Sequence, residues 1–256
     1  MAENGVQSVA RALSLMRLLA QGDGGSRLSD LARAAGLPVS TAHRLLTTLE
    51  QQGFAQFEPA SALWHVGRDA FTVGLAYGRR LSFVAPALPL LRRLRDATRE
   101  TANLGILDDD QLVTISQVES REIRRALSPP GRRVPVFCSA MGKAILATWR
   151  DDEVLALADR AGLPPLTTKS LRTREAALAE IARTRARGWA LDDEEFNLGM
   201  RCLAAVVWSP QGEAACAISI SGAAVRLTED RLEPLGRLVA QAAQELTLVL
   251  GGVAPG

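Results

Sequence analysis

Histidine is nearly absent from this chain of 256 residues, which contains only His43 and His65. Both lie in the first third of the chain, so no Ser–His or Cys–His nucleophile pair can be assembled within residues 67–256. This absence excludes the commonest designs of acyl-transfer site from most of the chain. Any catalysis there would rest on carboxylates and a thiol, with Asp192 and Cys202 as the residues involved.

Cysteines and long apolar runs are also scarce. Cys138, Cys202 and Cys216 are odd in number and widely spaced, which favours a reducing compartment over a disulfide framework. The sequence has no C-x-x-C or H-x-x-x-H spacing, so we predict neither a metal site nor a cofactor. No stretch approaches the roughly 18 apolar residues of a membrane span, and the first residues lack the features of a signal peptide. We therefore expect a soluble cytoplasmic protein with no membrane partner.

Lysine occurs only at positions 143 and 169, and the formal net charge is +2. Binding to nucleic acid would therefore require local placement of charge and several copies of the binding unit. Gly142 and Lys143 lack the upstream glycine and the downstream Ser or Thr of a phosphate-binding loop, so we expect no nucleotide site there.

Residues 28–54 predict two short helices joined by a tight turn. Apolar residues recur at the helical spacing in the first helix, at Leu28, Leu31, Ala32 and Ala35. Gly36 is expected to end this helix in the left-handed conformation, and Pro38 prevents its simple continuation. Ser40 or Thr41 is expected to cap the next helix. That helix should bury a second apolar set, Ala42, Leu45, Leu46 and Leu49.

The other side of the second helix carries hydrogen-bonding side chains and one fixed cation: Ser40, Thr41, His43, Arg44, Thr47 and Thr48. Such a face fits the DNA major groove, where base edges differ and phosphates flank both sides. The helix pair alone could equally be an ordinary αα-hairpin with a solvated face. Strand-like residues at 54–57 and 63–66, around a turn, favour the first interpretation, because a hairpin after a recognition helix forms the wing of a winged helix-turn-helix.

We expect a winged helix-turn-helix domain at residues 5–67, a linker helix at 68–82 and a second domain at 83–251. The strands of the second domain are expected in two hairpins and two further segments: 102–107 with 112–118, 202–208 with 214–219, 123–127, and 134–137. Its helices are expected at 88–98, 141–149, 152–161, 173–187 and 228–250. Hairpins with helices before and after them predict an α+β domain with an antiparallel sheet.

Small polar residues stand where several of these elements begin or end. They are Ser139 at a helix start, where Ala140 and Met141 follow it, Cys202 at a strand start, and Ser219 and Ser221 at the end of its hairpin partner. A helix start favours an anion, so these groups could converge on a small carboxylate, or they could be ordinary cap and strand-end residues. For Asp193 and Glu194 a solvated turn is the favoured interpretation.

The chain resembles the IclR family of bacterial transcription regulators over essentially its whole length. The resemblance rests on five segments: LWHVG at 63–67, SAMGKAILA at 139–147, RARGWALDDEE at 185–195, GMRCLAA at 199–205, and ISISG at 218–222. It implies a winged helix-turn-helix, a linker helix and a GAF/PAS-like C-terminal domain, assembled as a homodimer or a dimer of dimers. It also implies that an effector contacts residues 139–141, Asp192, Cys202, Ser219 and Ser221. The wing and residues 189–195 are similar to the corresponding segments of family members that sense glyoxylate or related small acids.

We therefore predict a DNA-binding transcriptional regulator of the IclR type that is not an enzyme. Its partners would be double-stranded operator DNA and a small carboxylate effector that modulates operator binding. The first alternative is a small-molecule enzyme with an accessory helix-turn-helix domain. A second is a structural interaction module, which would show neither DNA binding nor a ligand response. The sequence leaves the choice between repression and activation open.

Overall fold

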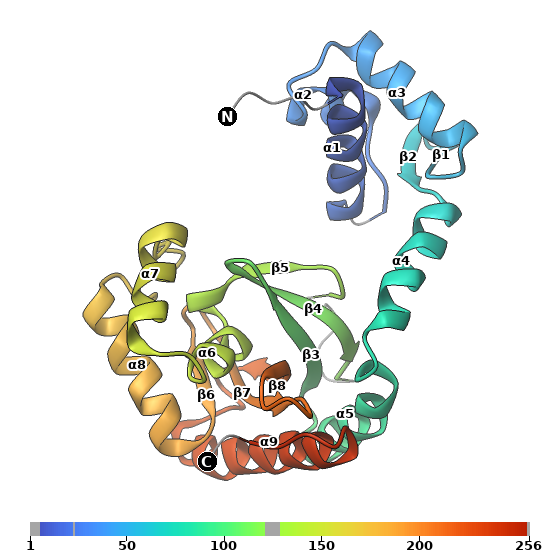
Figure 1. The fold of residues 1–256 in the computed structure, drawn as a ribbon. Helices are drawn as coiled ribbons and strands as arrows, with labels where there is room; N and C mark the ends of the chain where they lie inside the picture. Colours follow the sequence, from blue (N-terminus) through green and yellow to red (C-terminus); the bar gives the residue numbers. More distant parts are fainter. Residues whose placement is uncertain (1–5, 23, 121–128, 255–256) are drawn as a thin grey trace. The chain divides into compact units, whose positions relative to one another are not determined.

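The computed structural model describes residues 6–22, 24–120 and 129–254, and the chain divides into two compact units at residues 1–81 and 82–256. The first unit contains helices and one hairpin, coloured blue to teal in Figure 1. These elements are α1 (Gln7–Gln21), α2 (Leu28–Ala34), α3 (Val39–Gln51), β1 (Ala55–Glu58), β2 (Leu63–Val66) and α4 (Arg68–Arg80).

One small core joins the three helices and the hairpin of the first unit. It is built from Leu15 and Leu19 of α1, Leu31 and Ala32 of α2, Ala42 and Leu46 of α3, and Ala55 and Trp64 of the hairpin. The backbone of Trp64 also exchanges two hydrogen bonds of 2.9 Å with Ser26, just before α2. The hairpin is thus attached to the helix pair, and the predicted winged helix-turn-helix is confirmed.

The start of α3 differs from the prediction. Gly36 takes the expected left-handed conformation at φ +62°, but neither Ser40 nor Thr41 caps the helix. Helix α3 begins at Val39 with Pro38 in the cap position, and no side chain makes a cap hydrogen bond. The Pro38 carbonyl instead accepts the N–H groups of Thr41 and Ala42, both at 3.0 Å. The backbone carbonyl of Pro38 is thus the first hydrogen-bond acceptor of the helix.

The junction between β2 and α4 is a close approach of two backbone segments. Gly67 donates its N–H to the Phe54 carbonyl at 2.8 Å, and Asp69 donates to the Gly53 carbonyl at 3.0 Å. A Cβ atom at position 67 would lie 2.2 Å from the Gly53 carbonyl oxygen. Only glycine fits there without moving the backbone.

The second unit is an α+β domain, as predicted. Its helices are α5 (Val84–Thr98), the 3₁₀ turn η1 (Val136–Cys138), α6 (Ala140–Leu146), α7 (Asp151–Ala161), α8 (Arg174–Arg187) and α9 (Glu229–Val249). Its strands are β3 (Thr101–Asp108), β4 (Gln111–Val118), β5 (Arg133–Pro135), β6 (Ala190–Asp193), β7 (Met200–Trp208) and β8 (Ala214–Ala223). They form one antiparallel sheet in the order β5-β4-β3-β8-β7-β6.

Different helices cover the two faces of this sheet. Helices α5 and α9 lie along one face and the short α6 packs on the other (Figure 1). Alanines make the contact under α6, with Ala190, Ala204 and Ala217 of the sheet in one cluster with Ala140 and Ala144 of the helix. Because these side chains are small, α6 lies close to the strands. The face under α6 is where the predicted effector residues meet.

The two edges of the sheet approach each other. Arg132, next to edge strand β5, places its guanidinium 5.7 Å from the ring centroid of Phe196, which follows edge strand β6. The sheet is therefore curled around the face that carries α6.

Two of the predicted strands and one predicted turn differ from the described structure or lie outside it. Residues 123–127 lie outside the described residues. The strand expected at 134–137 ends at Pro135, which has no N–H for a further ladder bond, and the chain turns into η1. The turn expected at Asp193 is wrong, because residues 190–193 form β6 on β7. Arg201 of β7 binds the Asp193 carboxylate at 2.6 Å, so this acid is paired within the sheet.

Candidate functional site

The six residues predicted to meet DNA lie on the free side of α3. Ser40, His43, Arg44 and Thr48 are exposed, and Thr41 and Thr47 are half-buried. All but Ser40 line a hollow of about 570 Å³ along the helix, together with Ser8 of α1 and Leu45. This face combines hydroxyl groups, an imidazole and a guanidinium, the donors and acceptors that read base edges and phosphates.

Two of these side chains have defined contacts inside the unit. The Thr48 hydroxyl donates to the Arg44 carbonyl at 2.9 Å, so toward DNA this oxygen can only accept. The His43 ring meets Trp64 of the hairpin edge-on, with centroids 6.4 Å apart. The wing thus contacts the recognition helix at His43.

In the second unit the strand register aligns the predicted effector residues. Asp192 of β6 lies opposite Cys202 of β7, which lies opposite Ser221 of β8. Two positions along, Ser219 of β8 lies opposite Asn103 of β3. Residues opposite each other, or two apart on one strand, share a face, and Ala190 and Ala204 place this face under α6.

A buried amide orients the two serines. Asn103, only 2% exposed, donates its Nδ2 hydrogens to Ser219 Oγ at 3.2 Å and Ser221 Oγ at 3.0 Å. Its own Oδ1 accepts from Gln117 Nε2 at 2.8 Å, which determines the orientation of the amide. Since both serine oxygens already accept, each hydroxyl is left to act as a donor. This geometry is suited to an anion.

The sequence reasoning missed Asn103 and Gln117. A usable signal was present, because Asn103 interrupts an otherwise apolar strand segment, and a buried amide needs hydrogen-bond partners. The identity of those partners depended on strand pairing, which the sequence alone does not show.

The start of α6 covers this polar row. Ser139 is buried and caps α6, with its Oγ accepting the Gly142 N–H at 3.3 Å. Ala140 and Met141 follow inside the helix. A Cβ atom at Gly105 of β3 would lie 3.0 Å from Met141 Cε, so the methionine side chain reaches this strand. Met141 therefore restricts the space above the serines.

Burial controls the protonation of the acid and the thiols. Asp192 is 4% exposed, and desolvation raises its pKa to about 7 although Lys143 opposes the shift. Its Oδ1 accepts the backbone N–H groups of Glu195 at 2.8 Å and Phe196 at 3.4 Å. Burial raises the pKa of Cys202 far above its usual range, and Asp192 adds to the shift. Cys202 therefore remains a thiol, which makes it a poor nucleophile.

A buried ion pair lies beside this row. Lys143 of α6 has no exposed surface, and its Nζ lies 2.7 and 2.6 Å from the two carboxylate oxygens of Glu195. Glu180 of α8 is 4.0 Å from the same Nζ. The sequence reasoning only excluded Lys143 from a phosphate loop, and its actual role is to hold the segment after β6 against α6.

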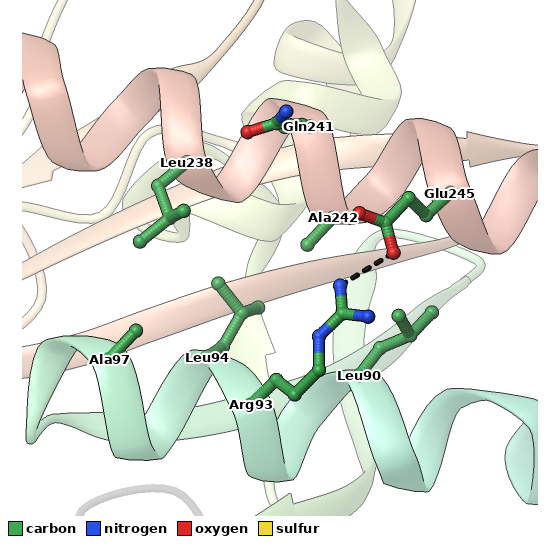
Figure 2. Close-up of a pocket in the computed structure, with 8 residues that line it drawn as sticks. All are labelled: Leu90, Arg93, Leu94, Ala97, Leu238, Gln241, Ala242 and Glu245. Atoms are coloured by element: carbon green, nitrogen blue, oxygen red, sulfur yellow. Dashed lines mark hydrogen bonds and ion pairs between the residues drawn. The ribbon is translucent and has the colours of Figure 1, made fainter.

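A second hollow lies between α5 and α9, on the opposite face of the sheet (Figure 2). It measures about 160 Å³, and Leu90, Leu94 and Leu238 are among its lining residues. Its cation, Arg93, is bound by Glu245 at 2.5 Å. This hollow therefore offers an organic acid no available charge.

The described residues contain neither a cluster of metal ligands nor a membrane-spanning helix. No three His, Cys, Asp or Glu side chains gather there as metal ligands. No helix in the described ranges is long and apolar enough to cross a membrane.

Comparison with known families assigns both units. Residues 8–59 match the IclR helix-turn-helix domain, and residues 75–248 match the bacterial transcriptional regulator IclR C-terminal domain. The chain belongs to the IclR family. The resemblance inferred from the motifs is thereby confirmed.

Full-length relatives support the assignment to the IclR family. The chain is 40% identical to the acetate operon repressor of Salmonella typhimurium over 249 residues, covering 96% of this chain and 91% of that protein. It is also 40% identical to the transcriptional repressor IclR of Escherichia coli over 250 residues, covering 97% and 91%. The fold matches an IclR homologue from Microbacterium hydrocarbonoxydans in complex with 4-hydroxybenzoate, with a TM-score of 0.80, 21% identity and coverage of 95% and 99%.

These findings establish an IclR-type transcriptional repressor with a helix-turn-helix and a C-terminal effector-binding domain. Its homologues are repressors and not enzymes. The alternative of a small-molecule enzyme is not favoured, in agreement with the high pKa of Cys202 and the lack of histidine after residue 65.

Proposed function

We propose that this IclR-family repressor binds operator DNA through the exposed face of α3 and changes its affinity when a small organic acid binds under α6. With a net charge of only +2, one copy supplies little electrostatic affinity. The repressor therefore acts as a homodimer or a dimer of dimers on a two-part operator, in the cytoplasm where the operator lies. Residues 5–67 read DNA, 68–82 link the domains and 83–251 sense the acid.

The DNA-binding part of the proposal is supported by the exposure of Arg44, the one fixed cation on the α3 face. Replacing Arg44 with alanine should weaken operator binding by roughly 1–3 kcal/mol if the guanidinium reads a base. Fluorescence anisotropy titrations at fixed salt would measure this loss.

The matched control is Arg92→Ala, which removes an exposed arginine of α5 in the other unit. It lowers the total charge equally but should leave operator affinity unchanged. Full affinity in the Arg44 variant, or an equal loss in both variants, would refute the role of α3.

The effector part of the proposal is carried by Asn103, which donates to the Ser219 and Ser221 oxygens and so leaves both hydroxyl groups as donors on the face under α6. Such donors bind a carboxylate, and Ser139 and Met141 limit the space to small acids. The homologue complexed with 4-hydroxybenzoate shows that a carboxylic acid binds a protein of this fold. Glyoxylate, pyruvate and 4-hydroxybenzoate are therefore the first compounds to test.

An acid that binds only the folded protein should raise its thermal stability, by about 2.7 kcal/mol at a hundred times its dissociation constant. Ser219→Ala should weaken binding about 10- to 100-fold, because a hydrogen bond to a charged group contributes roughly 1.5–3 kcal/mol. The control Ser116→Ala removes a hydroxyl from the opposite face of the sheet, since Ser116 lies opposite Leu104. If no acid shifts the melting temperature, the carboxylate site is wrong.

A further inference from the structure

Asp192 is a buried carboxyl group that forms no salt bridge with any cation of the described residues. It accepts the backbone N–H groups of Glu195 and Phe196, and it hydrogen-bonds to the Cys202 thiol. The nearest cation, Lys143, binds both carboxylate oxygens of Glu195. The positive charge on the α6 side of Asp192 is therefore already neutralised.

The other elements around Asp192 also bring paired charges. On α8, Glu180 is bound by Arg183 at 2.8 Å and Arg187 at 2.7 Å. Next to Asp192 in the chain, Asp193 is bound by Arg201 of β7. Lys169 binds Glu194 at 2.5 Å and approaches Asp193 at 3.4 Å. The neighbouring thiols stay neutral, since burial raises the pKa of Cys138 to about 11 and that of Cys202 further.

Asp192 belongs to the same polar row as the two serines. The Cys202 thiol interacts with both the Asp192 carboxyl and the Ser221 hydroxyl. An acid held by Ser219 and Ser221 would therefore lie close to the Asp192 carboxyl, which belongs to the same row on this face of the sheet. Two carboxylates brought together in a buried site repel each other, so the pKa of one of them rises strongly, and Lys143 is already engaged by Glu195.

We propose that an organic acid binds this site together with one proton, which Asp192 carries, so that the effector response depends on pH. This inference rests on the carboxylate effector proposed above. The proton comes from solvent, no covalent bond changes, and the protonated Asp192 gains an O–H donor for the ligand carboxylate. Neutral pH is the sensitive range, because burial raises the pKa of Asp192 to about 7.

Isothermal titration calorimetry of the full chain with glyoxylate and with 4-hydroxybenzoate tests this inference. Titrations in phosphate and in Tris, whose heats of ionisation differ, give the number of protons taken up. We expect about half a proton per site at pH 7 and close to one at pH 8. Above pH 8 the dissociation constant should rise roughly tenfold for each pH unit, as linkage to one proton requires.

Two variants test whether Asp192 is the group that takes up the proton. Asp192→Asn imitates the protonated carboxyl group, so it should bind the acid without proton uptake and with a dissociation constant independent of pH. Asp193→Asn removes the adjacent carboxylate, which Arg201 holds, and should keep the wild-type pH dependence. Circular dichroism spectra would show that both variants fold.

The outcomes separate this inference from the proposed function. If an acid binds the wild-type chain without proton uptake, the inference fails and the carboxylate site stands. Proton uptake that persists in Asp192→Asn also refutes it. If neither acid binds at any pH, the proposal of a carboxylate effector is wrong, and the proposed proton uptake fails with it.

Discussion

Asp192 shows how one side chain acquires a property that its residue type does not have. In water its carboxyl would lose its proton near pH 4, but at 4% exposure the charged form is poorly solvated. The two backbone N–H groups and Lys143 stabilise the anion, and desolvation outweighs them. Burial therefore moves the pKa of Asp192 close to neutral pH.

The same shift predicts a pH dependence of stability. Between pH 4 and pH 7 the folded chain keeps a proton on Asp192 that the unfolded chain has lost, so the free energy of unfolding should fall as pH rises through this window and then level off. A pKa rise from 3.8 to about 7 corresponds to roughly 4 kcal/mol. Urea unfolding at pH 4 and pH 8 should show Asp192→Asn close to wild type at pH 4, near the unfolded pKa, and more stable at pH 8. An equal difference at both pH values would contradict this expectation.

At the scale of elements, the junction between the hairpin and α4 depends on a glycine. A methyl group at position 67 would meet the Gly53 carbonyl at 2.2 Å, whereas at Gly74 of α4 nothing lies within 4 Å. Both glycines take ordinary negative φ values, so the difference is steric and not conformational.

We therefore expect Gly67→Ala to lower the free energy of unfolding of the DNA-binding unit by about 1–3 kcal/mol, the usual cost of overpacking. Gly74→Ala should instead stabilise it by up to roughly 1 kcal/mol, since alanine favours a helix. Thermal unfolding followed by circular dichroism distinguishes the two. Similar melting temperatures for both variants would show that the junction can relax.

At the scale of the whole molecule, the proposed response to an organic acid requires that the acid site and the DNA-binding face influence each other. Thermodynamic linkage makes this influence reciprocal: if an acid weakens operator binding by some factor, operator DNA must weaken acid binding by the same factor. Titrating the acid into the repressor with and without saturating operator DNA should give matching factors, typically 5- to 150-fold. Unequal factors would indicate that the two ligands do not act through one equilibrium.

Local patterns in the sequence determined most of the elements and the DNA-binding face. The helical spacing of Leu28, Leu31 and Ala32, the left-handed Gly36 and the alternation of the hairpins depend on neighbours only a few residues away. The polar side of α3 follows from the same periodicity. The start of α3 was an exception, because a proline carbonyl took the role expected of a serine or threonine.

The tertiary structure alone decided the chemistry of the effector site. Asn103 and Ser221 are 118 residues apart and Lys143 and Glu195 are 52 apart, so their contacts depend on which strands and helices pack together. Burial, which determines the protonation of Asp192 and Cys202, is likewise a property of the packed domain. The sequence by itself therefore determined the architecture and the polar face of α3, whereas the orientation of the serines and the raised pKa of Asp192 arose from packing between distant segments.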